Sequence, residues 1–171
     1  IYYRDSIVGT YKNYTINSVA PVSSGGICLI QMLNILENFE IEKYKHSDPE
    51  RIHIIAETFK IVFADRYKYI GDPEYIDIPI KSLLSKKYAT QRARQINLKK
   101  SQVYQYTEGL LDNESNNTTH FNVADNEGNI VSMTQTINNA FGSRVAINET
   151  GMMMNNCMLL FDPHKGNANS I

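Results

Sequence analysis

The 171-residue chain has little of what marks several classes of protein. Its charge is nearly balanced, with 17 basic and 18 acidic residues, and no basic stripe alternates with aromatic residues, which argues against a nucleic-acid partner. No apolar run is long enough to span a membrane, and no signal-like hydrophobic region is present. Its two cysteines, Cys28 and Cys157, lie far apart and match no metal-ligand or CxxC spacing. We therefore expect both to be buried thiols, with no disulfide and no metal site.

Composition and the two chain ends bound the size of the folded unit. Hydrophobic residues make up 42% of the chain and charged residues 20%, which suits one compact globular domain or part of a larger one. The chain begins at Ile1, inside a segment rich in glycine and tyrosine, and stops in the loop-like stretch DPHKGNANSI. We therefore expect an internal piece of a longer protein.

Helical periodicity dominates the first part of the chain. Residues 9–21 alternate loosely between apolar and polar and predict a short strand or hairpin. A helix should follow Ser23 and Ser24, which are candidate N-caps, because apolar residues recur after them at helical spacing. A second helix is predicted from about Pro49 to Tyr69, and a third near Ser85–Ile96. The third is basic, and we interpret its charges as a solvated face.

Strand periodicity replaces helical periodicity after a polar, irregular segment from about Asn97 to Asn117. This segment is the one credible internal linker in the sequence. Because helices come first and strands follow, the order of elements favours an α+β fold or a layered αββα arrangement over a βαβ repeat.

Three charged residues of the second predicted helix allow two interpretations. Glu57, Asp65 and Arg66 lie on or near this helix, and paired acids are capable of acid–base chemistry. A helix-spaced set of acids and an arginine more often forms a structural ion-pair network. We favour the structural role.

The turn signal DNEGN, residues 125–129, predicts an antiparallel hairpin. A three-residue loop places Gly128 in the left-handed position of a type I turn with a G1 bulge. Paired residue numbers then sum to 254, so that Thr118 opposes Thr136. Directly opposed residues have Cβ atoms about 4.5–5.5 Å apart, so the two threonine hydroxyls can meet.

The two faces of this hairpin differ in polarity. One face carries polar side chains: Thr118, His120, Asn122, Ser132, Thr134 and Thr136. The other is mostly apolar: Thr119, Phe121, Val123, Val131, Met133 and Ile137. A one-residue slip would mix the two sets and is disfavoured for that reason. We expect the apolar face to pack on a core, and the polar face to meet water or a bound molecule.

The polar face has two possible meanings. It is either the wetted side of an edge hairpin, with threonine present for its strand propensity, or part of a reactive site. In the second case, a cut between Asn117 and Thr118 would make Thr118 an N-terminal residue. Its α-amino group, with a pKa of about 7.7–8.0, could then accept the proton of its own hydroxyl without a separate histidine or aspartate. The amino-acid composition does not distinguish between a wetted edge hairpin and a reactive site.

The stretches NNTTHFNVADNEGNIVSMTQTINNAFGSRV and TGMMMNN, followed by Cys157 and Met158, closely resemble the start of the small subunit of γ-glutamyltransferases (γ-glutamyltranspeptidases), which are N-terminal-nucleophile hydrolases. Upstream, APVSSGGICLIQMLNILENFEI, AETFKIVFADRYKYIGDP and LLSKKYATQRARQI resemble the end of that family's large subunit. The resemblance implies a four-layer αββα sandwich, of which this chain is an internal part. Residues 1–117 would end the large-subunit region and residues 118–171 would begin the small one.

The resemblance also implies an activity and roles for residues. The precursor would cut itself at the Asn117–Thr118 bond, and Thr118 would then act as the nucleophile that forms an acyl-enzyme. Thr136 matches the family's second threonine, which orients the nucleophile. Asn138 matches the asparagine that holds the α-carboxylate of a γ-glutamyl group.

Two positions depart from the family pattern. In the NNxMxxF stretch, the family commonly has glutamine where Cys157 stands and has aspartate where Leu160 stands; the aspartate binds the α-amino group of the substrate. Leu160 cannot pair with an ammonium, and an ammonium without its carboxylate in a closed pocket costs a few kcal/mol. These substitutions favour an acyl group without that amine, such as a glutaryl-like chain, and hence an acylase-like branch.

The expected partners follow from this resemblance. They are a small acyl or γ-glutamyl substrate, water or an acceptor amine, and the chain's own two subunits after cleavage; no cofactor or metal is expected. The alternative is a non-catalytic scaffold or storage member of the same fold, which the changes at Cys157 and Leu160 would allow. The presence of both Thr118 and Thr136 argues against that alternative, because a purely structural hairpin does not need a threonine at the cut position.

Overall fold

The computed structural model describes residues 3–104 and 118–170, which divide into two units. The described part of the first unit is residues 3–104 with 166–169, and that of the second is residues 118–165 with 170. Asn117, the residue before the predicted cut, lies outside the described residues.

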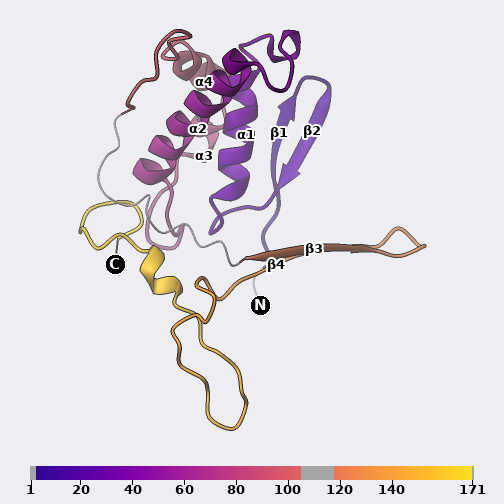
Figure 1. The fold of residues 1–171 in the computed structure, drawn as a ribbon, viewed down its shortest axis with the longest axis vertical. Helices are drawn as coiled ribbons and strands as arrows, with labels where there is room; N and C mark the ends of the chain where they lie inside the picture. Colours follow the sequence, from indigo (N-terminus) through magenta and orange to yellow (C-terminus); the bar gives the residue numbers. More distant parts are fainter. Residues whose placement is uncertain (1–2, 105–117, 171) are drawn as a thin grey trace. The chain divides into compact units, whose positions relative to one another are not determined.

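The first unit contains one hairpin and a group of helices (Figure 1). Strands β1 (Ile7–Tyr11) and β2 (Tyr14–Ser18) pair antiparallel, with Ile7 opposite Ser18. The short strand or hairpin predicted for residues 9–21 is thus a hairpin, which begins two residues earlier than predicted and ends at Ser18. The helices are α1 (Gly25–Leu36), the short 3-10 helix η1 (Ile41–Lys43), α2 (Pro49–Tyr69), α3 (Ile80–Leu83) and α4 (Lys86–Ala93).

The bounds of α2 match the prediction, whereas the third predicted helix is shorter than expected. Instead of Ser85–Ile96, α4 covers Lys86–Ala93. Ser85 caps it, because its Oγ accepts a hydrogen bond from the backbone N of Tyr88 at 3.2 Å. Ser24 is the N-cap residue of α1, but its side chain makes no capping bond and instead accepts from Arg66 Nε at 3.0 Å.

The core of the first unit forms around α1, which contacts α2, α4 and the β1–β2 hairpin. Ile27 and Ile35 on α1, Ile61 and Val62 on α2, and Ala89 on α4 are completely buried. Each large aliphatic side chain removed from water contributes about 1.5–3 kcal/mol to folding. Cys28, as predicted, is buried and unpaired, and burial raises the pKa of its thiol.

Asp65 joins three helices through a buried polar cluster. Its carboxylate accepts hydrogen bonds from Gln31 on α1, from Tyr88 OH at 3.0 Å, and from Arg92 Nη2 at 2.7 Å on α4. The side chain of Arg92 is only 16% exposed, so the prediction that the charges of α4 form a solvated face is wrong for this residue. A buried carboxylate needs a paired cation, and Arg92 on α4 provides it.

Glu57 forms a second, separate cluster on α2. Its carboxylate accepts from Lys60 Nζ at 2.7 Å, Ser101 Oγ at 3.1 Å, the backbone N of Gln102 at 3.1 Å and Tyr104 OH at 2.8 Å. The predicted structural role of the acids on α2 is thus confirmed, although Arg66 pairs with neither of them. The start of the predicted linker is irregular, as expected, but it is fastened to α2 by these bonds.

The second unit is built on a hairpin of β3 (Thr119–Ala124) and β4 (Ile130–Gln135). Its register pairs His120 with Thr134 and Ala124 with Ile130, so paired numbers sum to 254 as predicted. Gly128 has φ +86° in the turn, and the backbone N of Asp125 donates to Asn129 O at 3.1 Å. The remaining regular element is the 3-10 helix η3 (Cys157–Leu160).

The apolar face of this hairpin does not lie in a core within the described residues, contrary to expectation. Phe121, Val123, Val131 and Met133 are 41%, 58%, 58% and 48% exposed. Two strands bury little by themselves, since a two-stranded sheet needs another layer to cover its apolar face. The mixture of helices and small antiparallel sheets agrees with an α+β fold. The four-layer sandwich stays a prediction.

We predict that Glu57→Gln destabilises the protein in a pH-dependent way. Burial alone would raise the pKa of Glu57, but hydrogen bonds from Lys60, Tyr104 and their neighbours hold its pKa below its usual value of 4.5. A depressed pKa gives stabilisation that is present above that value and is lost as pH falls through the folded-state pKa. The variant should therefore lose about 1–3 kcal/mol at neutral pH and much less at an acidic pH below the folded-state pKa.

Thermal or urea unfolding at the two pH values measures this difference. Glu50→Gln is the matched control, because Glu50 lies exposed in the first turn of the same helix. A loss of stability by Glu57→Gln that is equal at both pH values would contradict the prediction.

Candidate functional site

The candidate site lies at the start of β3, where two threonine hydroxyls meet. Thr118 directly precedes β3, and its Oγ1 donates a hydrogen bond to Thr136 Oγ1 at 3.2 Å. The predicted contact is confirmed. It follows from the register, because the pairs that continue beyond Thr119 and Gln135 place Thr118 opposite Thr136. Thr118 is exposed, so its hydroxyl is accessible within this unit.

Thr136 is held by a second bond from its own strand end. The backbone N of Asn138 donates to Thr136 Oγ1 at 2.9 Å. A hydroxyl oxygen has two lone pairs, so Thr118 and Asn138 together saturate it as an acceptor. The side chain of Thr136 is thereby fixed in one orientation, pointing at Thr118.

Further polar contacts continue along the same face of the hairpin. His120 Nδ1 lies 2.8 Å from Thr134 Oγ1, and His120 Nε2 lies 3.5 Å from Ser132 Oγ. The predicted register placed these residues on one face, with His120 opposite Thr134, but gave His120 no chemical role. The signal was the two-residue spacing of Thr118 and His120 on one strand.

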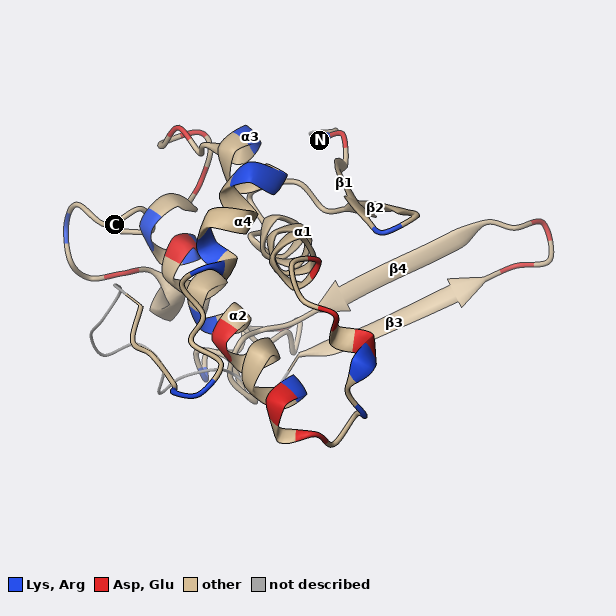
Figure 2. Ribbon diagram, turned by 90° about the horizontal axis from the view of Figure 1, so that it is seen from above, with Lys and Arg blue, Asp and Glu red and all other residues tan. Residues whose placement is uncertain are grey.

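The hydroxyl face carries no fixed charge. Strands β3 and β4 contain no Lys, Arg, Asp or Glu, and the acidic residues of the hairpin gather at its turn (Figure 2). There, hydrogen bonds from the side chain and backbone of Asn129 hold the pKa of Asp125 below its ordinary value. A nucleophile at Thr118 would therefore have no carboxylate, lysine or arginine beside it on these two strands.

Asn138 is buried directly after this strand. It is 6% exposed and has φ +72°, a conformation that asparagine tolerates better than most residues. Its Nδ2 donates to the backbone O of Asn156 at 3.4 Å. The structure thus brings Asn138 together with Thr136 on one side and with the residue preceding η3 on the other.

Cys157 and Leu160 lie on η3, three residues apart. A 3-10 helix has three residues per turn, so both side chains point to the same side of it. Leu160 is 58% exposed. Cys157 is unpaired but only partly buried, so the prediction of a buried thiol is wrong for this cysteine, which lies in a short helix outside any core.

The loop between residues 139 and 156 is closed by its own backbone bonds. Ser143 N donates to Met154 O at 2.9 Å, Met154 N donates to Val145 O at 2.9 Å, and Ile147 N donates to Met152 O at 2.8 Å. Gly142, with φ +52°, allows this close approach, since a Cβ there would lie 2.1 Å from Met154 O. The two ends of the loop therefore return to one place.

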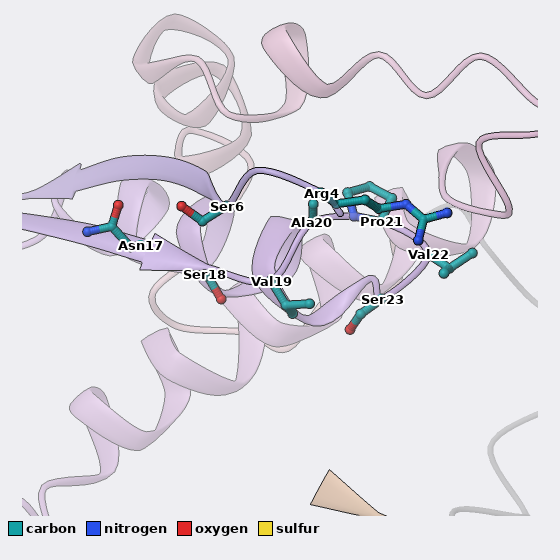
Figure 3. A pocket seen from close by; sticks show the side chains of 9 residues that line it. All are labelled: Arg4, Ser6, Asn17, Ser18, Val19, Ala20, Pro21, Val22 and Ser23. Carbon is teal, nitrogen blue, oxygen red and sulfur yellow. The ribbon is translucent and has the colours of Figure 1, made fainter. Parts of the chain in front are cut away.

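A hollow elsewhere, in the first unit, includes none of the predicted site residues (Figure 3). It has a volume of about 580 Å³ and lies between the ends of the β1–β2 hairpin and the segment before α1. Its lining is mostly small or polar: Arg4, Ser6, Asn17, Ser18, Val19, Ala20, Pro21, Val22 and Ser23.

Among the described residues, no cluster of His, Cys, Asp and Glu side chains could hold a metal ion. No helix within residues 3–104 or 118–170 is long and apolar enough to cross a membrane.

Comparison with known proteins decides the family. The family model described as Gamma-glutamyltranspeptidase matches residues 2–171. The chain belongs to the gamma-glutamyltranspeptidase family. The resemblance found in the sequence motifs is thereby confirmed.

Two branches of the family are represented among the relatives. The chain is 45% identical to the Acylase ACY 1 proenzyme of Pseudomonas sp. (strain SE83), over 98% of this chain and 30% of the relative. It is 40% identical to the Glutathione hydrolase proenzyme of Escherichia coli (strain K12), over 97% of this chain and 29% of the relative. The chain thus spans less than a third of the length of these gamma-glutamyltranspeptidase relatives.

A solved structure shows a similar arrangement over nearly the whole chain. The crystal structure of cephalosporin acylase from Bacillus halodurans matches with a TM-score of 0.74 and 26% identity, over 98% of this chain and 29% of that chain. The fold is therefore that of part of a gamma-glutamyltranspeptidase-family protein.

We predict that Gly142→Ala opens the loop that connects Asn138 to η3. The added methyl group would collide with the carbonyl of Met154, in addition to the cost of about 1–2 kcal/mol for a left-handed alanine. Gly151→Ala is the matched control, because Gly151 also has positive φ but a Cβ there meets nothing within 4 Å. Thermal unfolding and limited proteolysis of the loop compare the two variants, and equal effects would contradict the prediction.

Proposed function

We propose that this chain carries the junction between the large and small subunits of a self-cleaving N-terminal-nucleophile hydrolase. Residues 1–117 form the end of the large-subunit region and residues 118–171 the start of the small one, within a four-layer αββα sandwich. The observation that carries the proposal is the hydroxyl pair of Thr118 and Thr136 at the head of β3, with 3.2 Å between the two oxygens. Membership of a family whose relatives are named proenzymes supports it.

In the proposed maturation, Thr118 cuts the bond that precedes it. Its Oγ attacks the carbonyl carbon of Asn117, the C–N bond breaks, and the hydroxyl proton passes to the departing amine of Thr118. Water then hydrolyses the resulting ester, which leaves a carboxylate on Asn117 and a free α-amino group on Thr118. Thr136 orients the attacking oxygen, because its own orientation is held by Asn138 N.

The mature nucleophile works with a base from its own residue. An N-terminal α-amino group has a pKa of about 7.7–8.0, so roughly a tenth of it is neutral at pH 7, and this fraction can accept the Thr118 hydroxyl proton. Attack on an acyl substrate gives an acyl-threonine ester and releases the leaving amine. Water or an acceptor amine then takes the acyl group, and no cofactor enters the reaction.

The proposed acyl substrate resembles a glutaryl chain more than a γ-glutamyl group. Leu160 and Cys157 face the same side of η3, and neither can provide a carboxylate for the substrate ammonium. Asn138 would hold the distal carboxylate that both acyl groups share. The similarity to an acylase at 45% identity and to a cephalosporin acylase structure supports this branch. A γ-glutamyl substrate is the second candidate, favoured by the similarity to a glutathione hydrolase.

We predict that Thr118→Ala in the full-length protein abolishes both self-cleavage and acyl transfer. Loss of a nucleophile lowers turnover by roughly a thousandfold or more. Thr119→Ala is the matched control, because Thr119 is the neighbouring threonine and faces the other side of the hairpin. Intact-mass measurement and N-terminal sequencing report the cut, and a chromogenic anilide reports turnover.

Two outcomes of that experiment would contradict the proposal. A single uncut wild-type chain that still turns over substrate would exclude the N-terminal nucleophile. Unchanged behaviour of Thr118→Ala would support a scaffold or storage member of the family instead.

We predict that Leu160→Asp raises activity on a γ-glutamyl anilide relative to a glutaryl anilide, by roughly tenfold. The added carboxylate would pair with the α-ammonium, and the exposure of this position screens part of the gain. Leu159→Asp adds the same charge one residue earlier, toward another side of η3, and serves as the control. An unchanged ratio of the two kcat/KM values would show that Leu160 does not line the amine pocket.

A further inference from the structure

Asn156 connects two parts of the second unit that the proposed function needs together. Its backbone N donates to Ile137 O at 3.3 Å, its Oδ1 accepts from Asn139 N at 3.1 Å, and its backbone O accepts from Asn138 Nδ2 at 3.4 Å. One residue thus binds three consecutive residues that follow Thr136. No other residue in the described part of the loop reaches all three.

The same residue also begins η3. Asn156 is its N-cap, and Asn156 O accepts from the backbone N of Leu159 at 3.1 Å. The backbone oxygen of Asn156 therefore accepts two hydrogen bonds. One comes from the side-chain amide of Asn138, and the other comes from Leu159 N in the first turn of η3. Any shift of Asn156 moves Cys157 and Leu160 relative to Asn138.

On the other side, Asn138 leads back to the threonine pair. Its backbone N donates to Thr136 Oγ1 at 2.9 Å, and Thr136 Oγ1 accepts from Thr118 at 3.2 Å. The bonds thus run from Thr118 through Thr136 and Asn138 to Asn156 and η3, all within one unit.

The rest of the loop cannot replace Asn156 in this role. Its internal bonds, such as Ser143 N to Met154 O, hold the loop together as a body but leave its orientation to the bonds at its base. The neighbouring Asn155 makes only a local side-chain bond, in which its Oδ1 accepts from Cys157 N at 3.0 Å. Without the side-chain acceptor of Asn156, the base of the loop would keep its two backbone bonds to Ile137 and Asn138 but lose the bond to Asn139 N, which weakens the hold on η3.

We propose that Asn156 is a positioning residue that sets acyl selectivity, by fixing Cys157 and Leu160 at a defined place relative to Thr118 and Thr136. This rests on the proposed function, in which Thr118 is the nucleophile and η3 contacts the acyl group. Self-cleavage depends less on Asn156, because the backbone register of β3 and β4 holds Thr118 against Thr136 without it.

The test compares Asn156→Ala, Asn156→Asp and Asn155→Ala in the full-length protein. Self-cleavage is followed by intact mass, and kcat and KM are measured on glutaryl and γ-glutamyl p-nitroanilides, together with the melting temperature. Asn156→Ala should cut itself like the wild type but lose about tenfold to a hundredfold in kcat/KM on the preferred anilide, since small misplacements near a reacting centre cost that much. The ratio of the two substrates should move toward one.

Asn156→Asp should restore most of the loss, because it keeps an oxygen acceptor for Asn139 N. Asn155→Ala should behave like the wild type. The proposal is overturned if Asn156→Ala matches Asn155→Ala, or if self-cleavage, both activities and the melting temperature fall together, which would show a purely structural role. A wild-type protein that neither cuts itself nor hydrolyses either anilide would overturn the proposed function, and this proposal with it.

Discussion

The arrangement of the candidate site depends on the register of one hairpin. Six backbone pairs from Thr119–Gln135 to Ala124–Ile130 align β3 with β4, and a turn with Gly128 at φ +86° sets their offset. The carboxylate of Asp125 fixes this turn, since it accepts from the backbone N of Glu127 and of Asn129, each at 2.9 Å. A shift by one residue would turn Thr118 and Thr136 to opposite faces, because side chains alternate along a strand.

From this register the polar contacts extend in two directions. Along the hairpin they join His120 to Thr134, and beyond the strand end they join Asn138 to Asn156 and η3. The acids of α2 serve another purpose. Asp65 and Glu57 have their oxygens occupied by donors from other segments, so they bind α1, α4 and residues 101–104 to α2. The candidate site and the structural polar clusters therefore lie in different units.

Predictions that rest on local patterns agree with the structure. The bounds of α2, the β1–β2 hairpin and the contact between Thr118 and Thr136 all follow from periodicity and turn chemistry over short stretches. The pairing of Arg92 with Asp65 and of Tyr104 with Glu57 could not be foreseen in this way, because each joins segments distant in the sequence. The same holds for the exposed apolar face of the hairpin, whose burial depends on what packs against it.

The amino-acid sequence by itself determined the family and the register of β3 and β4. These are properties of short segments, in which the spacing of residue types specifies local geometry. The tertiary structure decided which residues Asn156 holds together, that Cys157 and Leu160 share one side of η3, and that Glu57 and Asp65 are saturated by hydrogen bonds. The physical reason is that a hydrogen bond between distant segments depends on how the chain returns to itself, which no local pattern encodes.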